Sequence, residues 1–217
     1  MLRVFRFYCL LSCFFIASSV QAGPAIPSLY QAWLNVQIEQ VSETQLSQYQ
    51  QLISEANELT QEFPDMAESW ALSGMIKSHY ADKVSGLAGL KSAKQARKEL
   101  QHALTVDPYV FYGVACAELG FLYQKTPGWP ISFGSEKMAR KLYDKALEIN
   151  PNGLITNIRY GEFFFDLHEY TLAKQYLLTA TQAISLQENK LWLDYQVQKA
   201  KHLINKIEQK NSFAVAQ

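Results

Sequence analysis

The sequence predicts an all-α fold, a solenoid of about three helical hairpins with capping helices on both flanks. Two observations lead to this prediction. Pairs of alanines recur with a spacing of seven residues, and a glycine precedes each pair on a stretch with helical periodicity. No stretch shows the alternation of apolar and polar residues that would make a convincing strand.

Each of the three units contains a glycine, an alanine, a large residue and a second alanine in this order, with large residues around the glycine. The units comprise Trp70, Gly74, Ala96, Leu100, Ala103 and Pro108, then Leu119, Gly120, Tyr123, Ala139, Tyr143, Ala146 and Pro151, and finally Tyr160, Gly161, Phe164, Ala173, Leu177 and Ala180. Glycine on the first helix and alanine on the second leave room for the two backbones to approach closely. Proline ends the second helix, because the residue before a proline avoids helical backbone angles.

This order of residues resembles the tetratricopeptide repeat, which stacks helix pairs into a curved solenoid. Residues 84–90, 123–134, 150–153 and 160–163 also resemble one family of periplasmic tetratricopeptide proteins of uncharacterised function. A more distant likeness is to tetratricopeptide proteins associated with periplasmic solute transporters. The resemblance implies the hairpin fold and an exported protein, and it implies no particular activity.

The spacing between the glycine and the first alanine differs between the units. It is twelve residues from Gly161 to Ala173, nineteen in the second unit and twenty-two in the first, so we expect insertions of seven and ten residues in two hairpin loops. Such insertions fall on one face of a solenoid, which is often a binding face. The second insertion carries Trp129, Ile131 and Phe133, for which two interpretations stay open. These side chains plug the solenoid, or they form a lid that grips a partner.

The flanks of the repeats predict further helices within a single domain over residues 23–210. We expect one helix over residues 28–41, a degenerate repeat helix over residues 52–63 and a long amphipathic helix over residues 191–207. Asp65 and Glu68 have the spacing of a capping box at the start of the next helix. We expect residues 211–217 to form a flexible tail.

The first 22 residues have the pattern of a secretory signal peptide, with two arginines, an apolar run from Phe7 to Ala17 and small residues up to Ala22. An uncleaved anchor and a lipoprotein cleavage box at Cys13 are the alternatives. Cleavage after Ala22 leaves 18 basic and 20 acidic side chains, which are interleaved, so we expect no nucleic-acid partner. We predict a periplasmic or secreted protein whose mature part has no membrane span.

The sequence offers no constellation of catalytic or metal-binding residues. Cys116 lies among apolar residues of a predicted helix, so we expect a buried and unreactive thiol. The four histidines are scattered and lack the short helical spacing of metal ligands. We therefore expect no enzyme, no metal site and no cofactor.

The first helix of each hairpin is expected to line the concave groove of the solenoid. The candidate partner-binding residues of this groove and of the second insertion are Met75, His79, Phe121, Gln124, Lys125, Trp129, Phe133, Ile158, Glu162 and Phe165. They predict a scaffold or adaptor with a largely apolar groove that binds a protein or peptide. The chain's own C-terminal helix is one candidate occupant. The alternative function is a carrier of a small apolar ligand, closed by the Trp129 loop, that serves a solute transporter.

Overall fold

Helices dominate the computed structural model, which describes residues 25–183 and 189–215. In chain order they are α1 (Ala25–Gln37), α2 (Glu43–Glu62), α3 (Ala67–Lys83), α4 (Gly86–Val106), the short 3-10 helix η1 (Val110–Gly113), α5 (Val114–Lys125), α6 (Glu136–Ile149), α7 (Leu154–Asp166), α8 (Tyr170–Gln182) and α9 (Lys190–Val215). Within the described residues the only β pairing is an isolated bridge between Gly128 and Gly134. The predicted all-α fold is confirmed.

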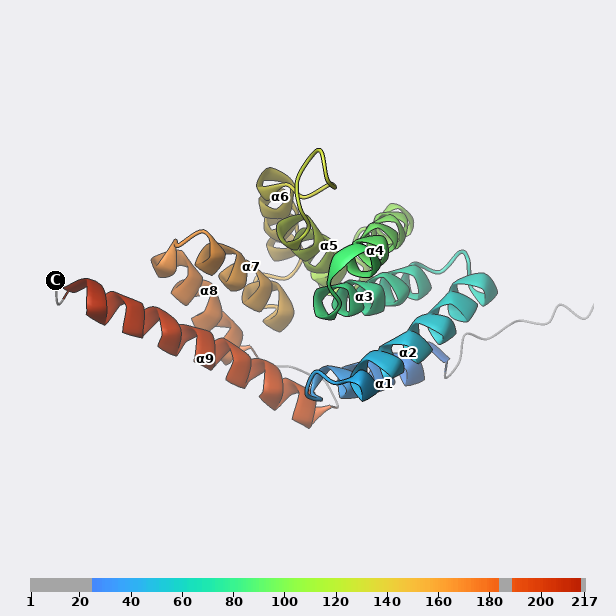
Figure 1. Cartoon of the computed structure of the whole chain (residues 1–217), viewed down its shortest axis with the longest axis horizontal. Helices are drawn as coiled ribbons and strands as arrows, with labels where there is room; N and C mark the ends of the chain where they lie inside the picture. Colours follow the sequence, from blue (N-terminus) through green and yellow to red (C-terminus); the bar gives the residue numbers. More distant parts are fainter. Residues whose placement is uncertain (1–24, 184–188, 216–217) are drawn as a thin grey trace, which may run out of the picture.

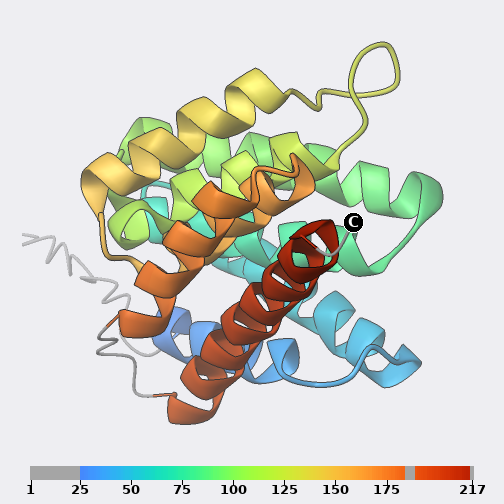
Figure 2. The same cartoon turned by 90° about the vertical axis from the view of Figure 1, so that its left-hand side faces the viewer.

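Consecutive helices pack as hairpins that follow one another along a curved path (Figure 1). α3 pairs with α4, α5 with α6 and α7 with α8, while α2 packs against α3. α9 packs on α8, and its first turns reach α1 at the other end of the path (Figure 2). The two ends of the path therefore meet, and α9 encloses one side of the concave face.

The hairpins cross where the sequence predicted close approach. A Cβ atom built on Gly74 would lie 2.7 Å from Cγ of Leu100, and one built on Gly161 would lie 2.7 Å from Cγ of Leu177. Both leucines are fully buried and have no free space to move into. The pattern of glycine, alanine and large residue therefore marks the helix crossings, as expected.

α1 begins and ends earlier than the helix predicted over residues 28–41. At this end the side-chain amide of Gln45 of α2 donates hydrogen bonds to the carbonyl oxygens of Val36, at 2.7 Å, and Glu39, at 3.0 Å. These bonds satisfy carbonyl groups that have no helical partner at the end of a helix. Ser42 caps the start of α2 by accepting a hydrogen bond from the backbone N–H of Gln45.

The predicted capping box of Asp65 and Glu68 is wrong. α3 begins at Ala67 with Met66 at the N-cap position, so Asp65 lies one residue too early to cap the helix. Ser69 stabilises the first turn instead, because its hydroxyl donates a hydrogen bond of 2.7 Å to the carbonyl oxygen of Met66.

The first insertion is not a loop, contrary to the prediction. It lengthens both helices of its hairpin, so that residues 84–85 alone connect α3 to α4. Gly89 permits this sharp return, because a Cβ atom there would lie 2.3 Å from the carbonyl oxygen of Val84. Ser92 ties the two extended helices together with a hydrogen bond of 2.9 Å to the carbonyl oxygen of Lys77. The second insertion does form a loop, over residues 126–135 between α5 and α6.

The ends of the chain bear on the predictions about export. The predicted signal peptide over residues 1–22 lies outside the described residues. α9 continues as a helix through residues 211–215, where the sequence predicted a flexible tail. Among the described helices, none combines the length and the apolar character that crossing a membrane requires.

Candidate functional site

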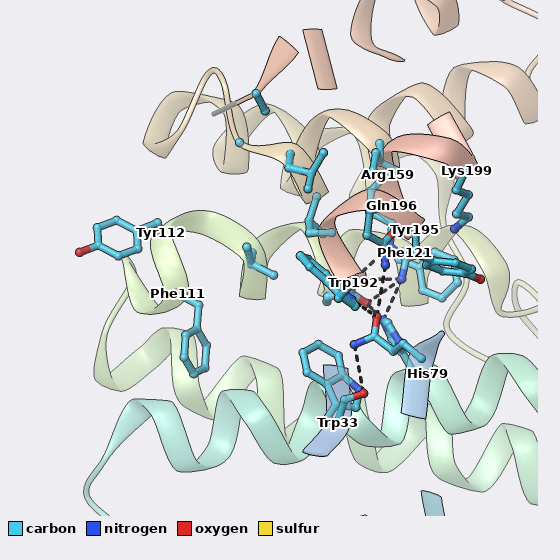
Figure 3. A pocket seen from close by; sticks show the side chains of 18 of the residues that line it. Trp33, His79, Phe111, Tyr112, Phe121, Arg159, Trp192, Tyr195, Gln196 and Lys199 are labelled. Atoms are coloured by element: carbon cyan, nitrogen blue, oxygen red, sulfur yellow. Dashed lines mark hydrogen bonds and ion pairs between the residues drawn. The ribbon is translucent and has the colours of Figure 1, made fainter. Parts of the chain in front are cut away.

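A cavity of about 1010 Å³ lies on the concave side of the helical path, bounded by α1, α3, α5, α7 and α9. Aromatic rings contribute much of its lining, namely Tyr30, Trp33, Tyr49, Phe111, Tyr112, Phe121, Trp192 and Tyr195. In Figure 3 the cavity extends from Phe111 and Tyr112 at one end to Arg159 and Lys199 at the other. Its volume is in the range of ligand-binding pockets in proteins.

Charged side chains meet at one end of this cavity. Arg159 of α7 donates from Nε to Oε1 of Glu118 at 3.0 Å, and from Nη1 to Oε2 of Glu162 at 3.2 Å. Its Nη2 lies 2.9 Å from Nε2 of His79. Lys199 of α9 pairs with Glu162 at 2.6 Å. We call these five residues the Arg159 network. It joins the first helices of three successive hairpins, α3, α5 and α7, to α9.

Burial makes each charge of the Arg159 network depend on its partners. The side chains of Glu118 and Arg159 are only 2% and 9% exposed. Burial opposes the charge of Glu118, but Arg159 and His79 outweigh it and lower the pKa of Glu118 to about 2. Burial also lowers the pKa of His79 despite the nearby Glu118, so the imidazole is neutral at pH 7. A neutral His79 accepts a hydrogen bond from Arg159 at Nε2.

The opposite end of the cavity carries two aromatic residues on a strained backbone. Phe111 and Tyr112 have φ of 50° and 51°, and Gly113 follows with φ of 87°. Residues other than glycine seldom adopt this left-handed region, at a cost of about 1–3 kcal/mol each. Phe111 stacks on Tyr30 of α1 with 5.7 Å between the ring centres, whereas Tyr112 is 79% exposed. The strained turn therefore presents aromatic surface at the cavity end.

α9 is joined to α1 by hydrogen bonds beside the cavity. Nε1 of Trp192 donates to Oε1 of Gln37 at 3.2 Å, and Gln196 approaches the same oxygen at 3.5 Å. The side-chain amide of Asn189 donates to Oδ1 of Asn35 at 2.8 Å. We call these contacts the α1–α9 clasp. Trp192 and Gln37 are 155 positions apart in the sequence, so the clasp closes the molecule upon itself.

A second cavity, of about 550 Å³, lies between α3, the start of α4, α5 and the loop over residues 126–135. Leu87 and Ile131 line it, and these two side chains are 86% and 66% exposed. Trp129 of the same loop is 90% exposed. We call these three exposed side chains the apolar patch, namely Leu87 and Ile131 at the cavity and Trp129, two residues before Ile131 on the same loop.

The exposure of the loop decides between its two interpretations. A plug formed by Trp129 and Ile131 is wrong, because both side chains face solvent. Phe133 alone folds back. Its ring centre lies 5.3 Å from that of Tyr123 and 4.2 Å from the guanidinium carbon of Arg97. Phe133 therefore anchors the loop, while Trp129 projects from it.

Half of the predicted groove residues lie at or in the wall of the concave cavity. His79, Phe121 and Ile158 line it, and Glu162 belongs to the Arg159 network. Met75 is fully buried in the core. The structure therefore brings His79, Phe121, Ile158 and Glu162 together beside the charged groups of the Arg159 network.

The remaining predicted residues of the helices do not line the concave cavity, although Lys125 lines the second cavity. Lys125 pairs with Asp166 at 2.6 Å, and the amide of Gln124 donates to the same oxygen at 2.8 Å. Phe165 packs on Tyr170, with 5.6 Å between the ring centres. These side chains fasten α5 to α7 and α7 to α8 at the surface.

Sequence reasoning missed the two central residues of the cavity, Glu118 and Arg159. A signal was available, because each lies two residues before the glycine of its unit, Gly120 and Gly161. Equivalent positions of successive repeats face each other, so opposite charges there predict an ion pair. No comparable signal existed for Lys199, because its contact depends on where α9 returns.

The Cys116 thiol is buried in the helical core. Cys116 is 3% exposed, and burial raises its pKa to about 11, which matches the expected inert side chain. Within the part of the chain that the structure describes, no group of three or more His, Cys, Asp or Glu residues is placed to hold a metal ion.

The described residues thus offer two candidate binding sites, the concave cavity and the apolar patch with the cavity beside it. Neither contains a nucleophile next to a base. The sequence matches no protein-family model, and it matches no curated protein.

Proposed function

We propose that this protein is an exported adaptor of the tetratricopeptide type, which binds a protein partner through the apolar patch. The predicted signal peptide and the resemblance to periplasmic repeat proteins support the compartment. The stacked hairpins support a scaffold, because such surfaces serve recognition in repeat proteins. The proposal involves binding and no catalysis.

The exposure of Trp129 carries this proposal. Large exposed apolar groups grouped on one surface mark interaction sites, and tryptophan is enriched among the residues that dominate binding energy. Backbone hydrogen bonds close the loop, from the N–H of Gly134 to Pro127 at 2.9 Å and from that of Ile131 to Gly128 at 3.1 Å. Because the loop is already ordered, little conformational entropy is lost when a partner binds.

The cavity beside the patch can receive side chains of the partner. Its apolar lining includes Val84, Leu90, Ala93, Phe121, Leu122 and Pro127. An amphipathic helix that buries its apolar face in such a groove would contact Leu87 and Ile131 at the rim. A partner helix with a few apolar anchors is therefore the class of ligand that fits this surface.

Affinity capture from an envelope extract tests the proposal. The immobilised wild-type protein is expected to retain a partner in stoichiometric amount, and Trp129→Ala should abolish this retention. Tyr109→Ala is the matched control, because Tyr109 is a 63% exposed aromatic residue outside the patch. Equal capture by Trp129→Ala and the wild type would show that the patch is not the binding surface.

A second candidate function, a small-ligand carrier, is favoured by the concave cavity. The sequence predicted an apolar cavity closed by the Trp129 loop. Instead, Trp129 and Phe133 are not among the residues lining this cavity, and charged residues lie at one end of it. A carrier would therefore hold a ligand with a polar group. Native mass spectrometry of the purified protein should then show a bound small molecule, and a bare protein mass would argue against carriage.

A further inference from the structure

Two residues that line the concave cavity carry buried hydrogen-bond donors without an acceptor among the described residues. Nε1 of Trp33 and the hydroxyl of Tyr49 have no hydrogen-bond partner among the described residues. Trp33 is 3% exposed and Tyr49 is 0% exposed, and both line the cavity. An unpaired buried polar group costs about 1–3 kcal/mol, so native proteins seldom keep one without a purpose.

Lys83 adds a positive charge to the same wall. It lines the cavity, its Nζ lies 5.9 Å from the centre of the Tyr49 ring, and it forms no ion pair among the described residues. Trp33 lies on α1, Tyr49 on α2 and Lys83 at the end of α3. Three donors from three helices therefore share this wall.

The acidic side chains of the cavity accept no hydrogen bond from these donors in the described part of the chain, although Asp82 is close enough for its charge to oppose the fall in the pKa of Lys83 that burial causes. Glu118 is committed to Arg159, which it binds through both carboxylate oxygens. Asp82 is exposed, and no ion pair joins it to Lys83 among the described residues. Among the described residues no acceptor is bonded to these donors, and an anion would supply one.

Aromatic rings provide apolar surface around these donors. Trp192 and Tyr195 of α9 and Phe111 of η1 line the same cavity (Figure 3). Trp192 is held in place by its hydrogen bond to Gln37. A ligand with an apolar body can pack against these rings while its polar group reaches α1, α2 and α3.

We propose that the concave cavity binds a small organic acid, whose carboxylate accepts hydrogen bonds from Trp33, Tyr49 and Lys83. Its aliphatic or aromatic body packs against the rings of α9 and η1. A carboxylate fits because its two oxygens accept several hydrogen bonds and neutralise an ammonium group. This inference rests on the carrier function and is independent of the adaptor role of the apolar patch.

Isothermal titration calorimetry with matched probes tests the chemical class. The acids are phenylbutyrate and decanoate, and phenylbutanamide and phenylbutylamine carry the same phenyl body without the negative charge. At least one acid is expected to bind, with the amide about tenfold weaker and the amine weaker still. Absence of binding by both acids at millimolar concentration overturns the proposal, as does equal binding of the amide or the amine.

Variants locate the carboxylate. Tyr49→Phe and Lys83→Met should each weaken binding of the acid about tenfold, because each removes a hydrogen bond to a charged group. Lys94→Met, an exposed lysine of α4 that does not line the cavity, should bind like the wild type. Urea unfolding checks that Tyr49→Phe is folded, which is expected because its hydroxyl has no partner to lose.

Two outcomes would overturn this inference, and a third measurement separates it from the adaptor role. Unchanged affinity in Tyr49→Phe and Lys83→Met would place the acid elsewhere and overturn the proposal. Binding of a peptide with a free C-terminal carboxylate, but of neither small acid, would overturn it in favour of a peptide ligand. Trp129→Ala should bind the acids normally, so a failure of partner capture leaves this result unaffected.

Discussion

Arg159 lies at the centre of the Arg159 network at one end of the concave cavity. Its guanidinium is surrounded by Glu118, Glu162 and His79, and its central carbon lies 3.9 Å from the centre of the Phe121 ring. A buried cation of this kind is stable only while its acceptors are present, because its desolvation is otherwise uncompensated. The Arg159 network therefore contributes to the fold as well as to the electrostatic character of the cavity.

Glu118→Gln should lower the free energy of unfolding by about 3 kcal/mol, because it leaves the buried Arg159 with a weaker partner. Urea unfolding followed by circular dichroism measures the loss. Lys125→Met is the matched control, since it breaks the Lys125–Asp166 pair, which is 42% and 44% exposed, and should cost less than about 1 kcal/mol. Equal effects of the two substitutions would contradict a stabilising role for the network.

His79 should make stability depend on pH. Because burial lowers its pKa in the folded state, the unfolded chain binds the proton more tightly. The contribution of His79 is complete above about pH 6.5 and is lost as the pH falls from there towards its folded pKa. His79→Gln should flatten the fall in unfolding free energy over this range, measured by urea titrations at several pH values. Parallel pH profiles of the variant and the wild type would argue against it.

Trp129 and Phe133 should differ in their effect on stability. Trp129→Ala is expected to leave the melting temperature unchanged, because the side chain is 90% exposed. Phe133→Ala should lower it by several degrees, because the ring packs on Tyr123 and Arg97. Differential scanning calorimetry measures both. A large loss in Trp129→Ala would mean that its side chain supports the fold.

At the scale of elements, the α7–α8 hairpin contains a close approach at Gly161. Gly161→Ala would place a Cβ atom 2.7 Å from Cγ of the fully buried Leu177. We expect a loss of about 1–2 kcal/mol in unfolding free energy, because overpacking outweighs the gain in helix propensity. Gly128→Ala is the control, since its Cβ would meet only the carbonyl oxygen of Gly134 at 3.4 Å. A Gly161→Ala variant as stable as this control would show that the crossing can relax.

The sequence predicted the helix crossings correctly but not the structure of the first insertion. The helix crossings were predictable, because glycine and alanine at a fixed spacing describe contacts within one hairpin. The fate of the first insertion was not, because the same ten residues can form a loop or extend two helices. Gly89 and Ser92 favour the extension only through contacts with Val84 in the connection and with Lys77 on the facing helix.

At the scale of the whole molecule, α9 decides whether the concave face is open or enclosed. The sequence suggested that this helix occupies the groove. The structure places it on α8 with its first turns clasped to α1, so that it forms a wall of the cavity. Trp192 is 3% exposed in this position, and Ile207 is fully buried.

Ending the chain after Ala183 should expose the apolar surface that α9 covers. We expect lower solubility and new binding of an apolar dye such as anilinonaphthalene sulfonate, measured by fluorescence. A chain ending after Lys210 is the control, because it keeps the clasp and the buried residues of α9. If the shorter chain stays folded and soluble without new dye binding, α9 is not a cap.

The sequence by itself determined the all-α fold, the three hairpin crossings and the burial of Cys116. These features depend on residue types a few positions apart, and such spacings translate directly into contacts within a helix or a hairpin. Only the tertiary structure decided the concave cavity, the Arg159 network, the α1–α9 clasp and the exposure of Trp129. They join side chains from helices far apart in the chain, and local residue patterns carry no information about how far a curved path of hairpins turns before its ends meet.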